Sequence, residues 1–172
     1  MTDSAAANEL RAFRNALRSR LIAAREALPA DIHAQLSRKV ERHLGELLDA
    51  LNPAVLAFCW PFRGEFDARA LVSGRLPGGL RACLPVVMDN NSPLEFREWT
   101  PHSEMIEDRY GIHIPARGEA LRPDAILMPL NGFDEAGYRL GYGGGYFDRS
   151  LASAEPRPRA IGVGFELARV AS

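Results

Sequence analysis

The sequence predicts an α/β protein in which helices cover both faces of a mainly parallel sheet. Strand-like segments alternate with helical segments along the chain, which is typical of parallel sheets. Several of the strand-like segments are apolar throughout, as in sheets that are buried on both faces. The chain has 172 residues, 47% of them hydrophobic and 25% charged, which suits one domain with a sizeable core. We therefore expect a single domain over residues 1–172.

Two amphipathic helices are predicted before the first strand. In residues 9–28, apolar side chains recur at three- and four-residue steps and form one stripe. This stripe comprises Leu10, Phe13, Leu17, Leu21, Ala24 and Leu28. Residues 32–51 repeat the pattern and end near Asn52, while Pro29 separates the two helices. Asp31 is a candidate N-cap of the second helix. We expect both helices to pack against a face of the sheet.

Five strands follow, separated by turn-forming or helical segments. They are predicted at residues 55–60, 80–87, 94–99, 124–130 and 159–165. The third alternates apolar and charged residues, which indicates a half-exposed strand. Asp67 is a candidate N-cap for a short helix over 68–72. Residues 100–123 show no regular pattern and predict a loop that wraps over the site, and a helix is expected to begin at Tyr146.

A glycine-rich stretch, residues 139–149 with the sequence RLGYGGGYFDR, is the strongest functional signal. Its glycines leave the backbone bare, so that it can take positive φ and approach a ligand closely. A strand precedes the glycines and a helix follows them, an arrangement that directs backbone N–H groups at a phosphate. Arg139 and Asp148 flank the glycines. The alternative is a flexible turn, and neither the GxGxxG nor the Walker pattern fits here.

Two further clusters predict ligand contacts. Arg14 and Arg18 are i,i+4 neighbours on the first helix, so their guanidinium groups can converge on one anion. The alternative is a solvated basic face. Residues 60–67 place aromatic side chains and Glu65 at the carboxyl end of a strand, where ligands bind in open α/β sheets. The alternatives are a core aromatic for Trp60 and an ordinary loop carboxylate for Glu65.

Composition argues against several other classes of protein. The formal net charge is −1, so no global field recruits nucleic acid, and no apolar run approaches the roughly 20 residues of a membrane span. Cys59 and Cys83 are expected to be buried and reduced, and the four histidines have no metal-ligand spacing. We expect a cytoplasmic monomer that binds neither nucleic acid nor membrane.

With these residues in view, the chain resembles the 5-formyltetrahydrofolate cyclo-ligase family, also called methenyltetrahydrofolate synthetases. The resemblance extends from about residue 10 to residue 170. Its most specific part is the stretch 139–149, which is similar to the bacterial form of the family's glycine-rich signature. Further matches are Arg14-x-x-Leu17-Arg18, residues 60–65 and residues 127–134.

The resemblance implies a three-layer αβα sandwich and an enzyme of one-carbon metabolism. It implies conversion of 5-formyltetrahydrofolate into 5,10-methenyltetrahydrofolate, with ATP and Mg²⁺ required and ADP and phosphate released. The implied steps are phosphorylation of the formyl oxygen and intramolecular cyclisation. The implied partners are therefore small molecules, ATP and a reduced folate.

The resemblance also implies roles for individual residues. ATP would contact Arg14, Arg18, Arg139, Leu140, Gly141, Tyr142, Gly143, Gly144, Gly145, Tyr146 and Phe147. The folate would contact Trp60, Glu65, Tyr142, Gly143, Gly144, Gly145 and Tyr146. Asp148 would hold Mg²⁺, and Arg139 and Tyr146 would be the catalytic residues.

The chain departs from the family pattern in two places. Some relatives have a lysine where this chain has Gly144, which would leave charge neutralisation to arginines and the metal. Relatives usually continue past this end with another strand and a second acidic metal ligand, so the expectation is either a shortened C-terminal end or a less complete metal site. Two alternatives stay open: a non-catalytic nucleotide- or folate-binding protein, and an enzyme like phosphosugar isomerases or acyl-CoA transferases, for which only Glu65 qualifies as catalytic residue.

Overall fold

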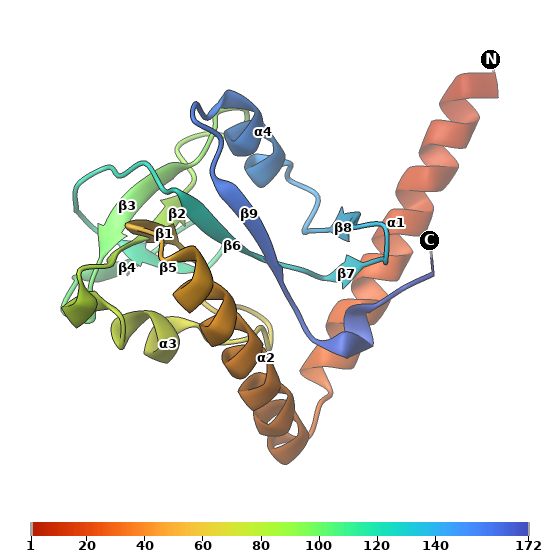
Figure 1. Ribbon diagram of the computed structural model, residues 1–172. Coiled ribbons are helices and arrows are strands. Elements are labelled where there is room, and N and C mark those ends of the chain that lie inside the picture. Colours follow the sequence, from red (N-terminus) through yellow and green to blue (C-terminus); the bar gives the residue numbers. More distant parts are fainter. Residues whose placement is uncertain (1, 172) are drawn as a thin grey trace.

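The centre of the molecule is a five-stranded sheet with the strand order β3-β2-β1-β6-β9 (Figure 1). The structure is a computed structural model that describes residues 2–171, so the predicted shortened end at Ser172 lies outside the described residues. Only the pairing of β3 with β2 is antiparallel, and the other three pairings in this sheet are parallel. The strands are β1 Val55–Ala57, β2 Arg81–Val86, β3 Glu95–Trp99, β6 Ala125–Pro129 and β9 Arg159–Val163. The prediction of a mainly parallel sheet is confirmed.

Helices cover both faces of this sheet, which confirms the predicted three-layer αβα sandwich. Helices α2 (Ala30–Leu51) and α3 (Arg69–Ser73) cover one face, and α4 (Tyr146–Ser153) covers the other. Alternation along β1 explains the two layers, because successive side chains of a strand point to opposite faces. Leu56 packs in the cluster beneath α2 and α3, whereas Ala57 packs in the cluster beneath α4.

The first helix, α1 (Thr2–Glu26), does not pack on the sheet, so that prediction is wrong. It stands beside the small hairpin of β7 (Gly132–Phe133) and β8 (Arg139–Leu140), near the C-terminal end of the chain (Figure 1). Its apolar stripe is covered only in part: Leu21 is buried, but Ala24 is exposed and Leu10 and Phe13 are 50% and 62% exposed. The spacing of apolar residues identified the helix and its apolar stripe, but it could not show which element packs against that stripe.

Both predicted N-caps are corrected in the structure. Pro29 holds the N-cap position of α2, and Asp31 lies inside the first turn without capping it. The Asp67 carboxylate does accept the Arg69 backbone N–H at 3.0 Å, but the N-cap position of α3 belongs to Ala68. Helix α2 ends at Leu51, and its C-cap, Asn52, has the left-handed conformation that commonly ends a helix. This agrees with the predicted end near Asn52.

Residues 100–123 are more regular than predicted. They contain the antiparallel pair β4 (Met105–Glu107) and β5 (His113–Pro115). Three-residue strands are too short to show a period of two, so the sequence pattern missed them. Two 3₁₀ turns, η1 (Leu76–Gly78) and η2 (Glu166–Ala168), complete the elements.

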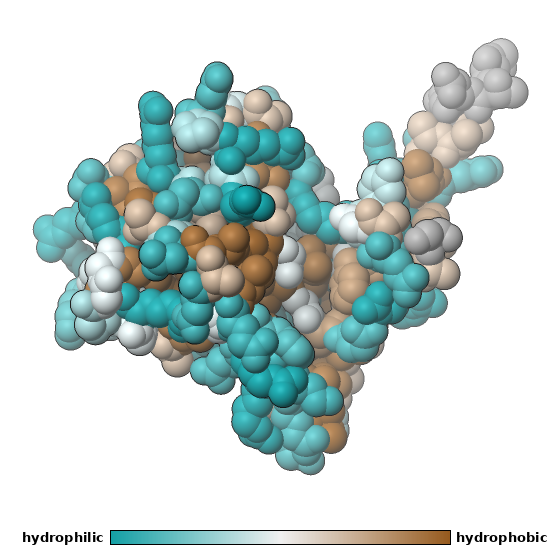
Figure 2. Space-filling view, in the orientation of Figure 1, coloured by the Kyte–Doolittle hydropathy of each residue, from teal (hydrophilic) through white to brown (hydrophobic). Residues whose placement is uncertain are grey.

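The surface shows how far α1 extends from the rest of the molecule. In Figure 2 the coloured part of α1 stands beside the body of the molecule, with a notch between them. The same view shows an apolar area between α2 and β9, where a groove is lined by residues that include Leu36, Val40, Leu47 and Ile161. Within residues 2–171, none of the helices combines the length and the hydropathy of a membrane span.

Candidate active site

One cavity of about 720 Å³ lies at the carboxyl ends of β1, β2 and β6. Residues that follow these strands line it, such as Trp60 after β1, Val87 after β2 and Pro129 at the end of β6. All of the residues predicted to form the site line this cavity: Arg14, Arg18, Trp60, Glu65, Arg139, Leu140, Gly141, Tyr142, Gly143, Gly144, Gly145, Tyr146, Phe147 and Asp148. The structure therefore brings together three segments far apart in sequence, although their individual roles remain predictions.

The glycine-rich loop forms one wall, between the end of β8 and the start of α4. Gly143 and Gly145 have φ of +96° and +66°, a region that favours glycine. Gly145 is the N-cap of α4, and no side chain caps the first turn. The N-terminal turn of α4 therefore presents backbone N–H groups and a positive dipole end at the cavity, as an anion requires.

Arg18 joins helix α1 to this loop. Its Nε donates to the Gly141 carbonyl at 2.6 Å, and its Nη1 donates to Asn15 Oδ1 at 2.7 Å. In the described part of the chain, no carboxylate pairs with Arg18 or with Arg14, one turn earlier. Two cations thus line the cavity beside the glycine loop without a compensating anion, which suits a phosphate ligand.

Arg139 and Asp148 form an ion pair at the other side of the loop. Asp148 is 74% exposed, so the pair is of the weak surface kind, and its partners can exchange at small cost. Across residues 2–171, no three His, Cys, Asp or Glu side chains gather as a metal site. Mg²⁺ is commonly held by one or two carboxylates together with substrate phosphates and water. The single carboxylate of Asp148 fits an ion that arrives with a phosphate, and does not fit a preformed cage.

Glu65 is the buried acid of the cavity, only 8% exposed. Its Oε1 accepts the Tyr142 hydroxyl at 2.7 Å, and its Oε2 accepts the Phe62 backbone N–H at 3.1 Å. Burial raises the pKa of Glu65, against the lowering effects of the Tyr142 hydrogen bond, the Arg25 charge and the Phe62 N–H. The alternative of an ordinary exposed loop carboxylate does not describe this residue.

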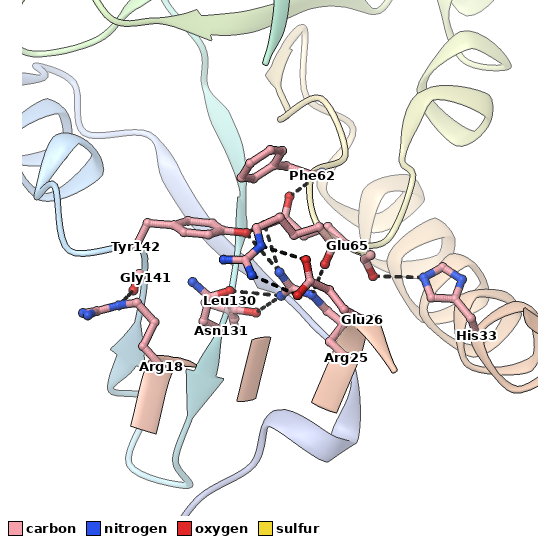
Figure 3. Close-up of polar contacts among 12 residues, drawn as sticks. Arg18, Arg25, Glu26, His33, Phe62, Glu65, Leu130, Asn131, Gly141 and Tyr142 are labelled. Atoms are coloured by element: carbon pink, nitrogen blue, oxygen red, sulfur yellow. Dashed lines mark hydrogen bonds and ion pairs between the residues drawn. The ribbon is translucent and has the colours of Figure 1, made fainter. Parts of the chain in front are cut away.

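Arg25 contacts two cavity-lining residues, Glu65 and Tyr142, and the sequence pattern missed it. It is 6% exposed and donates to the Arg63 carbonyl (2.9 Å), the Leu130 carbonyl (3.2 Å) and the Tyr142 hydroxyl (3.0 Å). Its Nη2 lies 3.7 Å from Glu65 Oε1 (Figure 3). One signal for Arg25 was available in the sequence. It lies four positions after the apolar Leu21 and seven after Arg18, and these spacings put it on the buried side of α1.

Aromatic side chains form the wall near β1 and β5. The Trp60 ring stacks with His113, with centroids 5.3 Å apart, and the Arg69 guanidinium lies 4.3 Å from the Trp60 ring centre. These contacts already use part of the Trp60 surface that we expected to face the folate. Phe62 and Tyr142 form a second, tilted pair with centroids 6.0 Å apart. No role was predicted for His113, because its spacing to the other histidines matches no metal-binding pattern.

The β4–β5 hairpin closes the cavity opposite the glycine loop. The Tyr110 and Tyr146 hydroxyls are hydrogen-bonded at 2.9 Å. Asp108, Ile112 and His113 of the same hairpin also line the cavity. These contacts confirm the expected cover of the site for residues 108–113 of the segment 100–123, which forms a hairpin and not an irregular loop.

Comparison with known proteins agrees with this architecture. The profile of the 5-formyltetrahydrofolate cyclo-ligase family matches residues 11–172. A 5-formyltetrahydrofolate cyclo-ligase of Escherichia coli is 30% identical over 133 residues, which cover 74% of this chain and 73% of the relative. The enzyme of the same name from Haemophilus influenzae is 28% identical over 144 residues, covering 80% and 77%.

Solved structures extend the similarity to three dimensions. The NMR structure of Aquifex aeolicus 5,10-methenyltetrahydrofolate synthetase has a TM-score of 0.75 and 28% identity, covering 92% of this chain and 81% of that one. A methenyltetrahydrofolate synthetase of Mycoplasma pneumoniae has the same fold, with a TM-score of 0.72 over 91% and 88% of the two chains. Because the family profile spans nearly the whole sequence, the chain belongs to the 5-formyltetrahydrofolate cyclo-ligase family, a family of ring-forming ligases.

Proposed function

We propose that this protein converts 5-formyltetrahydrofolate into 5,10-methenyltetrahydrofolate at the expense of ATP, with release of ADP and phosphate. The single observation that carries the proposal is the shared cavity, in which a glycine-rich loop and arginines lie beside an aromatic wall with a buried carboxylate. Family membership supplies the reaction class. The cavity volume of about 720 Å³ lies within the usual range for small-molecule sites.

In the proposed reaction, the γ-phosphoryl group of ATP moves to the formyl oxygen and ADP leaves. The neighbouring secondary amine of the folate then attacks the formyl carbon and loses its proton to water. The carbon–oxygen bond breaks last, and inorganic phosphate departs. Phosphoryl transfer needs positioning and charge neutralisation more than a protein nucleophile. Cys59 lines the cavity, but burial raises the pKa of its thiol well above the usual range, so it is a poor nucleophile.

The nucleotide is assigned to the side of the cavity formed by α1 and the glycine-rich loop. Backbone N–H groups at the start of α4 and the guanidinium groups of Arg14, Arg18 and Arg139 bind its phosphates. Arg139 neutralises charge on the transferred group and Tyr146 orients the reacting formyl group. Mg²⁺, with Asp148 as its protein ligand, supplies further charge neutralisation on the phosphates when it is bound.

The folate is assigned to the aromatic side of the cavity. Phe62 and Trp60 contact the flat pterin, and Glu65 accepts hydrogen bonds from its N–H edge. Holding the formyl group next to the attacking amine favours ring closure, an effect that reaches roughly 7–11 kcal/mol in well-oriented systems.

Turnover is tested by the appearance of the methenyltetrahydrofolate absorbance on mixing the protein with 5-formyltetrahydrofolate and Mg-ATP. We expect an ATP-dependent rise, and a drop of about 10²-fold or more in Arg139→Ala, because a preorganised charge partner of the transition state is removed. Arg157→Ala, at an exposed arginine outside the cavity, is the matched control and should retain the rate. Binding of ATP without any turnover would point instead to a binding protein.

A further inference from the structure

The buried carboxylate assigned to the pterin already has a hydrogen-bond donor from the glycine-rich loop. The Tyr142 hydroxyl donates to Glu65 Oε1 at 2.7 Å, while the other carboxylate oxygen accepts the Phe62 N–H (Figure 3). Oε1 also faces the Arg25 guanidinium at 3.7 Å, so a pterin N–H that binds this oxygen competes with the Tyr142 hydroxyl for it.

Tyr142 belongs to the segment that we assign to the nucleotide. It lies between Gly141, whose carbonyl is held by Arg18, and Gly143, whose φ is +96°. Tyr142 is 41% exposed as a residue, yet its hydroxyl points inward to Glu65, which is 77 residues away in sequence. This hydroxyl is thus a direct link between the loop and the aromatic side of the cavity.

Arg25 holds both partners of this contact. It donates to the Tyr142 hydroxyl at 3.0 Å and pairs with Glu65 at 3.7 Å. Its other donors are held by two backbone carbonyls and by the Asn131 side-chain oxygen at 3.1 Å. Both Arg25 and Glu65 are more than nine-tenths buried, so water cannot readily replace a lost partner. If the loop moves, another donor has to take the place of the Tyr142 hydroxyl on Glu65.

We propose that Tyr142 is a positioning residue that couples the nucleotide and folate subsites. The Tyr142 hydroxyl donates to the Glu65 carboxylate until a bound nucleotide draws the glycine-rich loop toward the nucleotide phosphates. The N–H edge of the pterin then donates to Glu65 in place of the hydroxyl. This inference rests on the proposed function, since it uses Glu65 as the folate acceptor and residues 141–145 as the phosphate loop.

The coupling has a definite sign. A bound nucleotide moves the Tyr142 hydroxyl away from Glu65, so the folate no longer competes with it and binds more tightly. Linkage then requires that the folate tightens nucleotide binding by the same factor. A hydrogen bond that only braces the resting loop predicts no such dependence of one affinity on the other ligand.

The test compares Tyr142→Phe with the wild type. The variant keeps the aromatic pair with Phe62 and loses only the hydroxyl. The dissociation constant of 5-formyltetrahydrofolate is measured by calorimetry with and without a non-hydrolysable ATP analogue. For the wild type we expect the analogue to tighten folate binding by about 5-fold or more. For Tyr142→Phe we expect tighter binding of folate alone and an effect of the analogue within about 2-fold of none.

Tyr138→Phe is the matched control, because Tyr138 is 77% exposed and does not line the cavity; it should show the wild-type coupling. Arg25→Lys keeps a cation but loses the planar fork of donors, and should also weaken the coupling. A single cooperative urea transition for Tyr142→Phe shows that the fold is retained, with a midpoint below that of the wild type because buried Glu65 loses a donor. If the ATP analogue tightens folate binding to Tyr142→Phe as much as to the wild type, the inference is overturned. Turnover by the wild-type protein would still support the proposed function in that case. A wild type that binds neither ligand overturns both.

Discussion

Arg18 ties helix α1 to the glycine-rich loop through the Gly141 carbonyl at 2.6 Å. The neighbouring Arg20 is exposed and does not line the cavity, although it lies on the same helix. One guanidinium therefore both shapes the loop and faces the assigned phosphates, whereas the other faces solvent.

For Arg18→Ala we expect the KM for ATP to rise about 10-fold or more, because hydrogen bonds to charged groups contribute about 1.5–3 kcal/mol. The KM for the folate should change much less. Steady-state kinetics with each substrate varied in turn measures both values, and Arg20→Ala provides the control. Equal KM values for ATP in Arg18→Ala and Arg20→Ala would contradict the assignment of Arg18.

Glu65 gives the stability of the ligand-free protein a pH dependence. Burial raises its pKa above the ordinary value of 4.5, so the folded state binds a proton more readily than the unfolded chain. Stability from this group is greatest below about 4.5 and falls as the pH rises through the raised pKa. Removing the titrating group removes this slope.

We therefore expect Glu65→Gln to gain stability relative to the wild type as the pH rises through this window. Urea unfolding at a series of pH values measures the difference in free energy of unfolding. A difference that stays constant with pH, or moves toward the wild type, would show that burial does not govern this carboxylate. Glu46→Gln, on an exposed site of α2, should show no such trend.

The residue scale also marks a limit of prediction from sequence. Spacing identified Arg14 and Arg18, since i,i+4 neighbours share a helix face. It did not identify Arg25, because its role depends on Glu65 and Tyr142, which are 40 and 117 residues away along the chain. Contacts of this kind are set by tertiary packing, and no local pattern reports them.

At the scale of elements, the glycine-rich loop depends on backbone conformation. Gly143 and Gly137 both have positive φ, +96° and +87°. A Cβ at Gly143 would lie 3.3 Å from the Arg18 guanidinium, whereas a Cβ at Gly137 would meet nothing within 4 Å. A comparison of alanine substitutions at these two glycines therefore distinguishes the cost of backbone strain from the effect of crowding in the site.

Each of Gly143→Ala and Gly137→Ala should lose stability by about 1–2 kcal/mol, the cost of a left-handed residue with a side chain. Only Gly143→Ala should also weaken ATP binding, because its methyl group presses on Arg18. Calorimetric titration with ATP and urea unfolding of both variants measure the two effects. Equal ATP affinity in the two variants would mean that the loop does not contact the phosphates.

Element prediction succeeded where segments are long or strongly patterned. The second long helix, the buried strands and the start of α4 were found within a few residues of their observed bounds, whereas α1 begins at Thr2, seven residues before its predicted start. The β4–β5 hairpin was missed, because its strands have three residues each. Helix capping was also assigned wrongly at Asp31, where the proline before it takes the N-cap position.

At the scale of the whole molecule, the mainly parallel sheet and its two helical layers were predicted from the alternation of strands and helices, whereas the order of the strands was not. The same reasoning placed α1 on the sheet, whereas the structure places it beside β7, β8 and η2 (Figure 1). Helix periodicity gives a buried face but not the element that buries it. The cavity could be anticipated because its parts follow parallel strands, which end at one edge of a sheet.

Since the cavity is built from α1, the β1 and β6 strand ends, the hairpin and α4, a bound nucleotide should stabilise the whole fold. At a concentration 100 times its dissociation constant, Mg-ATP adds about 2.7 kcal/mol. For a chain of this size that corresponds to an increase in Tm of roughly 5–11 °C. Thermal unfolding with and without Mg-ATP measures the shift, with inorganic phosphate at equal ionic strength as the control. A shift no larger than with phosphate would contradict a nucleotide site.

The two helical layers of the sandwich are unequal. Helix α2 has 22 residues and covers one face of the sheet, whereas α4 has eight and covers the other while also beginning at the glycine-rich loop. Short elements with few buried contacts open at low free-energy cost. In deuterium labelling, the amides of α4 should therefore exchange ahead of those in β1 and β6. Ligand that settles on the loop should slow that exchange, so isotope uptake at this one helix would report occupancy without any measurement of catalysis.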